Sequence, residues 1–193
     1  MYSEQNPARH YIALTLVWLL LGAALGLHFP DVDTRFQWLI SPRLLLHRSA
    51  VTHGLIVPSL LFLSARAKGK APSFRSFIIG FSLASAVHLC FDFFPRGWVG
   101  FALIHVPLYG RTTALFSQAW IMLGMLVCLY LAFLLVRRLI ELAFGAGILA
   151  ASFIVSAAEH AGPVLNALAL LLVAVGALVT ALRFRKPASG LTR

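Results

Sequence analysis

The sequence predicts an all-α protein with six transmembrane helices, and three observations support this fold class. Hydrophobic residues make up 60% of the 193 residues, and only 11% are charged, against about 25% in soluble proteins. The apolar residues form long runs, and the basic residues form short clusters between those runs. Because so few polar side chains cannot cover a water-soluble globule, most of the surface must face lipid.

Six apolar runs are long enough to cross a bilayer, which takes about 20 residues of helix. The predicted spans are residues 11–29, 44–65, 77–94, 114–136, 142–158 and 163–182. The second span is the least regular, because His47, Arg48 and His53 interrupt its first half and Pro58 its middle. The apolar segment 98–110 is too short to span and contains Pro107, so we expect an interfacial or re-entrant segment there.

These spans predict a single integral membrane domain over residues 1–193. Its part at 22–107 carries the polar motifs described below, and its part at 114–183 is a C-terminal set of helices. The first run begins near Tyr11 and is too long for the apolar core of a signal peptide, so we expect a retained helix. Cys90 and Cys128 lie in apolar runs without a CxxC motif, and buried cysteines of this kind behave as small hydrophobic residues.

The distribution of basic residues predicts that both termini are cytoplasmic. With the N-terminus inside, the inner segments carry Arg9, Arg66, Lys68, Lys70, Arg75, Arg137, Arg138, Arg183, Arg185, Lys186 and Arg193, and the outer segments carry Arg35, Arg43, Arg48, Arg96 and Arg111. This excess on one side follows the positive-inside rule and indicates a multi-pass protein of the cell (inner) membrane. The net charge of +10 does not indicate nucleic-acid binding, because the basic residues form no stripe with interleaved aromatic residues.

The same topology places most histidines and carboxylates on the outer side. The residues there are His28, His47, His53, His88, His105, His160, Asp31, Asp33, Asp92 and Glu159. An acidic residue at mid-membrane costs about 2.5–3.5 kcal/mol, which explains why polar groups lie near helix ends. It does not explain why they prefer the outer ends, so we expect a functional cause.

Three motifs carry this enrichment. They are His28-Phe-Pro-Asp31-Val-Asp33 after the first span, His47-Arg48-Ser-Ala-Val-Thr52-His53 at the start of the second, and Ser85-x-x-His88-x-x-x-Asp92 at the end of the third. Residues three and four apart share a helix face, so Ser85, His88 and Asp92 should form one polar stripe. A His/Asp pair four residues apart can hold one metal ion. Because three consecutive spans deliver such groups to one level, we predict a metal site.

Each motif also has a structural interpretation. A Pro-Asp-x-Asp sequence alone is a frequent turn and helix cap. A single membrane histidine more often hydrogen-bonds a neighbouring helix than binds metal. His47 and His53 are six residues apart and share a face only if His47 precedes the helix. His105 and His160 have no partner at ligand spacing, and we do not expect them to bind metal.

Together, the sequences PDVD, HRSAVTHG and SAVHLCFD resemble the YdjM-like family of membrane-bound metal-dependent hydrolases, over residues 22–107. The resemblance implies a divalent metal, zinc in the first place, and hydrolysis of an ester. By motif position it points to the metal ligands Asp31, Asp33, His47, His53, His88 and Asp92. There are departures, since Thr34 stands where a histidine is common, Gly54 replaces a serine, and one extra residue separates HR from TH.

For such an enzyme we expect a metal-activated water as nucleophile, Asp33 as general base and Arg48 as the group that holds a phosphate or carboxylate of the substrate. Six protein ligands would saturate zinc, so some of the six must contact other ligands instead. The expected partners are membrane lipid and a small-molecule or lipid-linked substrate. A proton- or ion-coupled carrier and a non-catalytic membrane subunit are the alternatives, and a carrier would need polar groups near the midplane.

Overall fold

The structure is a computed structural model that describes residues 7–36, 38–41, 44, 46–67, 72–159 and 163–183. Within them the α-helices are α1 (Pro7–His28), α2 (Val32–Phe36), α3 (Ile56–Ala67), α4 (Pro72–Asp92), α5 (Ala114–Leu135), α6 (Leu139–Glu159) and α7 (Val164–Arg183). A 3-10 helix, η1 (Gly100–Ala102), precedes a two-stranded antiparallel hairpin of β1 (His105–Val106) and β2 (Gly110–Arg111).

The prediction of an all-α polytopic fold is confirmed. Helices α1, α4, α5, α6 and α7 are each long and apolar enough to cross a membrane. Four of them follow the predicted spans closely, whereas α4 begins at Pro72 instead of Phe77. Proline suits the first turn of a helix, because the missing N–H would have no partner within the helix there.

The predicted second span, 44–65, is wrong in its first half. The described residues from 44 to 55 form turns, and only α3 is helical. At about 1.5 Å per residue α3 is about 18 Å long, which is shorter than the hydrocarbon core of about 30 Å. Pro58 lies in its first turn and therefore does not kink the middle of a span.

Helix α4 forms the centre of the bundle. Every residue from 78 to 92 is buried, and α1, α3, α5, α6 and α7 all contact this helix. In α4 83% of the most apolar stretch is buried, against 17% in α7, so α7 lies at the periphery. Side chains on α4 are therefore shielded from lipid by neighbouring helices.

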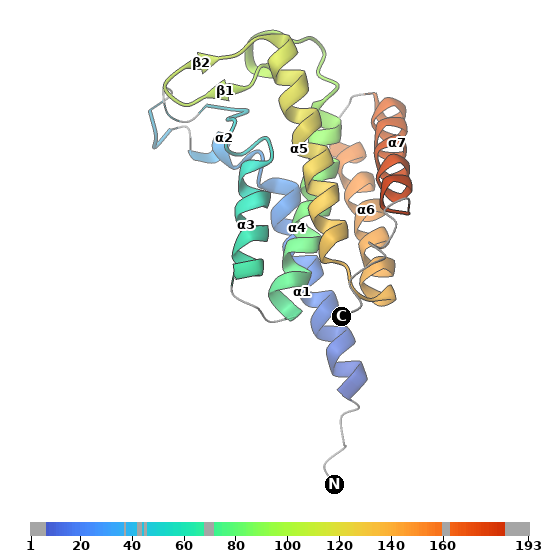
Figure 1. Cartoon of the computed structure of the whole chain (residues 1–193). Coiled ribbons are helices and arrows are strands. Elements are labelled where there is room, and N and C mark those ends of the chain that lie inside the picture. Colours follow the sequence, from blue (N-terminus) through green and yellow to red (C-terminus); the bar gives the residue numbers. More distant parts are fainter. Residues whose placement is uncertain are drawn as a thin grey trace, which may run out of the picture.

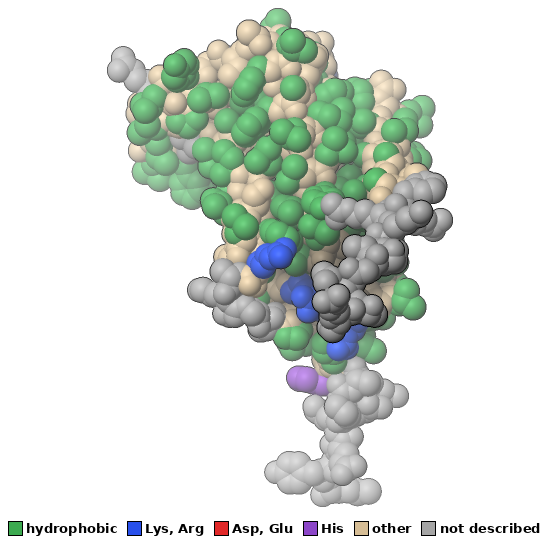
Figure 2. All heavy atoms as spheres, in the orientation of Figure 1, with side chains coloured by type: hydrophobic (Ala, Val, Ile, Leu, Met, Phe, Trp, Pro, Cys, Tyr) green, Lys and Arg blue, Asp and Glu red, His purple; other side chains and the backbone are tan. Residues whose placement is uncertain are grey.

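Helices α1, α4 and α6 run toward the end that carries α2 and the hairpin, and α3, α5 and α7 run back from it (Figure 1). We call this the site end, and we call the end with the α3–α4 and α5–α6 connections the opposite end. Apolar side chains cover the surface between them in the view of Figure 2. Exposed apolar side chains on the long helices include Leu25, Ile154 and Leu172, which suits contact with acyl chains.

A close contact between α1 and α4 sets the level of the site. A Cβ on Gly22 would lie 2.0 Å from the Phe77 carbonyl oxygen, and one on Gly26 would lie 2.2 Å from that of Phe81. Two glycines at this spacing let two backbones touch. Ser85 donates to the Gly26 carbonyl oxygen at 2.9 Å, so it joins the two helices and does not extend the polar stripe of α4.

Candidate metal site

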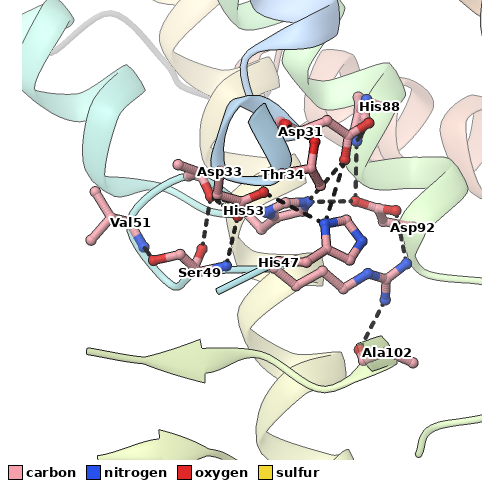
Figure 3. A network of polar contacts seen from close by, with 12 residues as sticks. Asp31, Asp33, Thr34, His47, Ser49, Val51, His53, His88, Asp92 and Ala102 are labelled. Atoms are coloured by element: carbon pink, nitrogen blue, oxygen red, sulfur yellow. Dashed lines mark hydrogen bonds and ion pairs between the residues drawn. The ribbon is translucent and has the colours of Figure 1, made fainter. Parts of the chain in front are cut away.

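The three motifs meet at the site end (Figure 3). The turn after α1 and helix α2 bring two aspartates, the loop before α3 brings two histidines, and the last turns of α4 bring a histidine and an aspartate. Their nitrogen and oxygen atoms form one connected network with separations of 3.3 to 3.9 Å. The convergence predicted from the sequence is therefore confirmed for all six residues: Asp31, Asp33, His47, His53, His88 and Asp92.

The innermost part of this network is formed by His53, His88 and Asp92. Asp92 Oδ2 lies 3.3 Å from His88 Nε2 and 3.5 Å from His53 Nε2. All three residues are buried, and their ligand atoms lie within 4.8 Å of one another. Because α4 carries two of the three on one face, the local helix geometry fixes their spacing.

Asp31 and His47 form the open side of the network. The Asp31 carboxylate lies 3.7 Å from both His53 Nε2 and His88 Nε2, and 3.9 Å from His47 Nδ1. Its side chain is 47% exposed and that of His47 is 28% exposed, whereas His53 is fully buried. Within this network of described residues, Asp31 and His47 are therefore the side chains that water reaches most readily.

The spacing of the buried group fits a divalent metal ion. Metal–ligand bonds of about 2.0–2.2 Å at a tetrahedral angle place two ligand atoms about 3.4 Å apart. The observed separations of 3.3 and 3.5 Å around Asp92 Oδ2 match that value. His53 Nε2 and Asp92 Oδ2 also have no hydrogen-bond partner among the described residues. Buried polar atoms usually have one, so these groups could hold a metal ion.

His53 is held in place from behind. Its Nδ1 lies 3.0 Å from Thr52 Oγ1 and 3.4 Å from Asp33 Oδ2. Asp33 Oδ2 also accepts hydrogen bonds from the Ser49 backbone N–H at 3.0 Å and from the Thr52 hydroxyl at 2.8 Å. With its Nδ1 proton directed to these oxygens, His53 turns the lone pair of Nε2 toward Asp92, as metal-binding histidines commonly do.

Asp92 is oriented by Arg48. The Arg48 guanidinium donates through Nη2 to Asp92 Oδ1 at 2.8 Å and through Nη1 to the Ala102 carbonyl oxygen in η1 at 2.9 Å. One carboxylate oxygen is thus fixed by arginine, and the other faces the histidines. Arg48 has a φ of 61°, a left-handed conformation that costs a non-glycine residue free energy. The surrounding contacts stabilise this strained residue.

The charges of the cluster favour a cation. With neutral histidines, three carboxylates and one guanidinium leave an excess negative charge that a divalent ion would balance. Burial alone would lower the pKa of His53, but Asp31 and Asp33 outweigh burial and raise this pKa to about 9. Burial would also raise the pKa of Asp33, but His47, His53 and the Ser49 N–H hold this pKa well below its usual range.

The segment 98–110, expected to be interfacial or re-entrant, contains η1 and most of the hairpin, and its backbone pairs with the loop before α3. The His105 carbonyl oxygen accepts from the Ala50 backbone N–H at 2.8 Å, and the His105 N–H donates to the Arg48 carbonyl oxygen at 2.8 Å. His105 is buried, yet its ring is not among the potential metal ligands. Burial, followed by the charge of Arg111, lowers the pKa of its imidazole. Its backbone therefore holds the loop that carries the site.

Three contributors were not predicted from the sequence, namely the Ser49 backbone, the Thr52 hydroxyl and the Ala102 carbonyl group. The position of Thr52 inside a motif was the only indication of its role. The roles of the two backbone groups could not be predicted, because every residue type has the same backbone N–H and C=O groups, except that proline lacks the N–H. His28 is exposed and outside the network. His160, Arg43, Lys68, Lys70, Arg185, Lys186 and Arg193 lie outside the described residues.

Two departures from the resembled family have local explanations. Thr34 donates from its hydroxyl to the Asp31 carbonyl oxygen at 2.6 Å and so stabilises the first turn of α2. At Gly54, a Cβ would lie 2.3 Å from Nε1 of Trp120, so the indole fills the space a side chain would need. Neither departure disturbs the convergence of the histidines and aspartates.

Comparisons with known proteins add no relative. No protein-family model matches the chain, and neither a curated protein nor a solved structure matches it significantly. The resemblance to the YdjM-like family therefore stays a prediction, and the geometry of the site is the observation that bears on function.

Proposed function

We propose that this chain is a membrane-bound, metal-dependent hydrolase of the YdjM-like type, acting on an ester or phosphoester at the outer membrane face. The observation that carries the proposal is the buried group of His53, His88 and Asp92, whose ligand atoms have the separations of a tetrahedral metal site. An open side next to this group distinguishes a catalytic site from a closed structural one.

Zinc is the ion that these ligands suit best. It takes imidazole nitrogen and carboxylate oxygen, and catalytic zinc sites have three protein ligands and one open position. His53, His88 and Asp92 would hold the ion, with Asp31 and His47 next to the open position. When bound, the ion supplies Lewis-acid activation of a water molecule and of the ester.

The other residues orient these groups and move a proton. Arg48 donates hydrogen bonds to the Asp92 carboxylate and to the Ala102 carbonyl oxygen. Because these bonds orient Asp92, they favour a positioning role over the substrate-binding role expected from the sequence. Asp33 is fully buried behind His53, and its other oxygen lies 3.5 Å from His47 Nδ1. His47 faces the opening with this carboxylate behind it, so it is placed to accept a proton from water.

The surroundings of the site support an amphiphilic substrate, such as a lipid-linked phosphate. Large apolar side chains are exposed after α2 at Trp38 and Leu39, and near the hairpin at Phe101, Leu108 and Tyr109. At the surface of a membrane protein such residues lie among lipid headgroups and acyl chains. A lipid substrate could reach the open side of the site from the outer leaflet of the inner membrane.

Arginines at the opposite end support the orientation. Among the described residues, that end carries six arginines and the site end carries four. The six are Arg9, Arg66, Arg75, Arg137, Arg138 and Arg183, and the four are Arg35, Arg48, Arg96 and Arg111. The positive-inside rule assigns the end with more basic residues to the cytoplasm. The site end would then face the periplasmic or outer side of the membrane.

The distribution of charged residues disfavours a carrier. Arg75 and His88 are about 20 Å apart along α4. Between these two residues, α4 carries no Lys, Arg, His, Asp or Glu. A carrier places such groups near the midplane, whereas here they lie at the two ends.

The test is hydrolysis by the purified protein in detergent with added zinc, using a panel of phosphate and carboxyl esters of lipids. His88→Ala should abolish hydrolysis, whereas Arg96→Gln, an exposed arginine four residues beyond Asp92, should not change it. If no ester is cleaved but sealed vesicles show ion movement that depends on His88, the carrier replaces the hydrolase. If neither occurs, a non-catalytic subunit is the better description.

A further inference from the structure

A cavity lies at the opposite end of the bundle, remote from the metal site. It has a volume of about 540 Å³ and lies between α3, α4 and the end of α5. Its lining combines three arginines with apolar side chains: Arg66, Arg75, Arg137, Phe62, Leu134 and Leu135. Basic side chains gather below the apolar surface in the view of Figure 2.

Glu141 is the carboxylate beside this cavity, and both of its oxygens already have partners. Its Oε1 pairs with Arg75, and its Oε2 accepts the backbone N–H groups of Arg137 at 2.8 Å and Arg138 at 3.2 Å. Glu141 therefore caps the start of α6. Among the described residues, no carboxylate lies within ion-pair distance of Arg66 or Arg137, so the cavity keeps an excess of positive charge.

Arg75, which also lines the cavity, has one N–H donor without a partner in the described part of the chain. This donor is the buried Nε–H. Guanidinium groups bind phosphate through paired N–H donors. The apolar wall of Phe62, Leu134 and Leu135 instead suits glycerol and acyl carbons. A ligand that satisfies both halves is an amphiphilic anion.

We propose that this cavity binds the phosphate headgroup of an anionic phospholipid. Its volume lies within the usual range of small-molecule sites, about 300–1,000 Å³. Basic pockets between transmembrane helices on the cytoplasmic side are typical sites for anionic headgroups. The site is independent of the metal site, because about 20 Å of α4 separates Arg75 from His88.

The test measures lipid binding to the purified full-length chain in neutral detergent, by native mass spectrometry and by thermal shift. The probes are phosphatidylglycerol, phosphatidylcholine and inorganic phosphate. Phosphatidylglycerol should bind and stabilise, and the other two should not. Arg66→Gln with Arg137→Gln should weaken that binding by roughly 25-fold, since each arginine near a lipid surface contributes about fivefold.

The control is Arg138→Gln, which removes one positive charge at the same end and is compared with Arg66→Gln and Arg137→Gln made singly. The Arg138 guanidinium lies over the Tyr11 ring, 4.2 Å from its centroid, and does not line the cavity. Arg75 is left unchanged, because its loss would leave the buried Glu141 carboxylate without its ion-pair partner. An equal loss of binding in Arg138→Gln would overturn the proposal, because only surface charge would then matter.

Two further results on the wild-type chain would overturn the proposal even if the double variant fails to fold. Equal affinity for phosphatidylglycerol and phosphatidylcholine would show that the headgroup charge is not recognised. Competition by inorganic phosphate at the affinity of the lipid would identify a free anion as the ligand.

Discussion

Replacing Arg48 with lysine tests whether this residue positions Asp92 or binds substrate. The substitution keeps the positive charge, so the electrostatic field at the metal site changes little. Lysine cannot reproduce the fork that bonds both Asp92 Oδ1 and the Ala102 carbonyl oxygen. At least one of the two hydrogen bonds is lost, and Asp92 becomes free to rotate away from His53 and His88.

The structure sets the size of the expected effect. Loss of a hydrogen bond costs about 0.5–1.5 kcal/mol, and loss of a residue that orients a metal ligand typically costs 10–100-fold in metal affinity. We therefore expect zinc to bind about tenfold more weakly to Arg48→Lys, as measured by competition with a chromogenic chelator. Arg96→Lys, at an exposed position of the same end, should bind zinc like the wild type.

The opposite pattern would refute this interpretation. If Arg48 holds the substrate phosphate, zinc affinity should be unchanged in Arg48→Lys and KM for the ester should rise. Metal titration and steady-state kinetics on the same preparation therefore separate the two roles.

Four further predictions follow from the same contacts. Asp33→Asn should lower zinc affinity about 10–100-fold, because the carboxylate behind His53 is lost. If zinc binding is unchanged and turnover falls about 10²–10⁴-fold, Asp33 is the general base instead. With chelator present, thermal stability should fall as pH rises from about 6.5 to about 9. The pKa of His53 is raised in the folded state, so folding is stabilised while the ring is protonated and this stabilisation is lost as the ring loses its proton. A melting temperature that stays flat or rises across that pH range would contradict this. Gly26→Ala should cost about 1–3 kcal/mol of stability and weaken zinc binding, because α1 must move from α4, whereas Gly147→Ala, which meets nothing within 4 Å, should cost nothing. Reporter fusions should be external near Gly110 and cytoplasmic after Arg138, and a cytoplasmic reporter near Gly110 would overturn the topology.

The sequence predicted those features of the candidate site that depend on residues close together in the chain. The spacing of His88 and Asp92 places them on one face of any helix, and the aspartates follow a proline just beyond an apolar run. The alternation of spans then brought three motifs to one level. Those inferences needed no knowledge of which helices touch.

The sequence did not predict features that depend on distant partners. The run 44–65 has the length and composition of a span, but its first half forms turns held by backbone bonds to His105. The roles of Asp33 and Arg48 also could not be assigned, because a carboxylate that binds metal and one that orients a histidine have the same residue type. Only the contacts with Ser49, Thr52 and Ala102 separate these roles.

The central claim is that His53, His88 and Asp92 hold a divalent metal ion, and its most direct test is the metal content of the purified protein. After exposure to zinc and removal of free ion, the wild type should retain about one zinc per chain. His28→Ala, which changes an exposed histidine outside the network, should retain the same amount. His88→Ala should retain none. A wild-type chain that holds no metal, or a His88→Ala chain that holds as much as the wild type, would contradict the account.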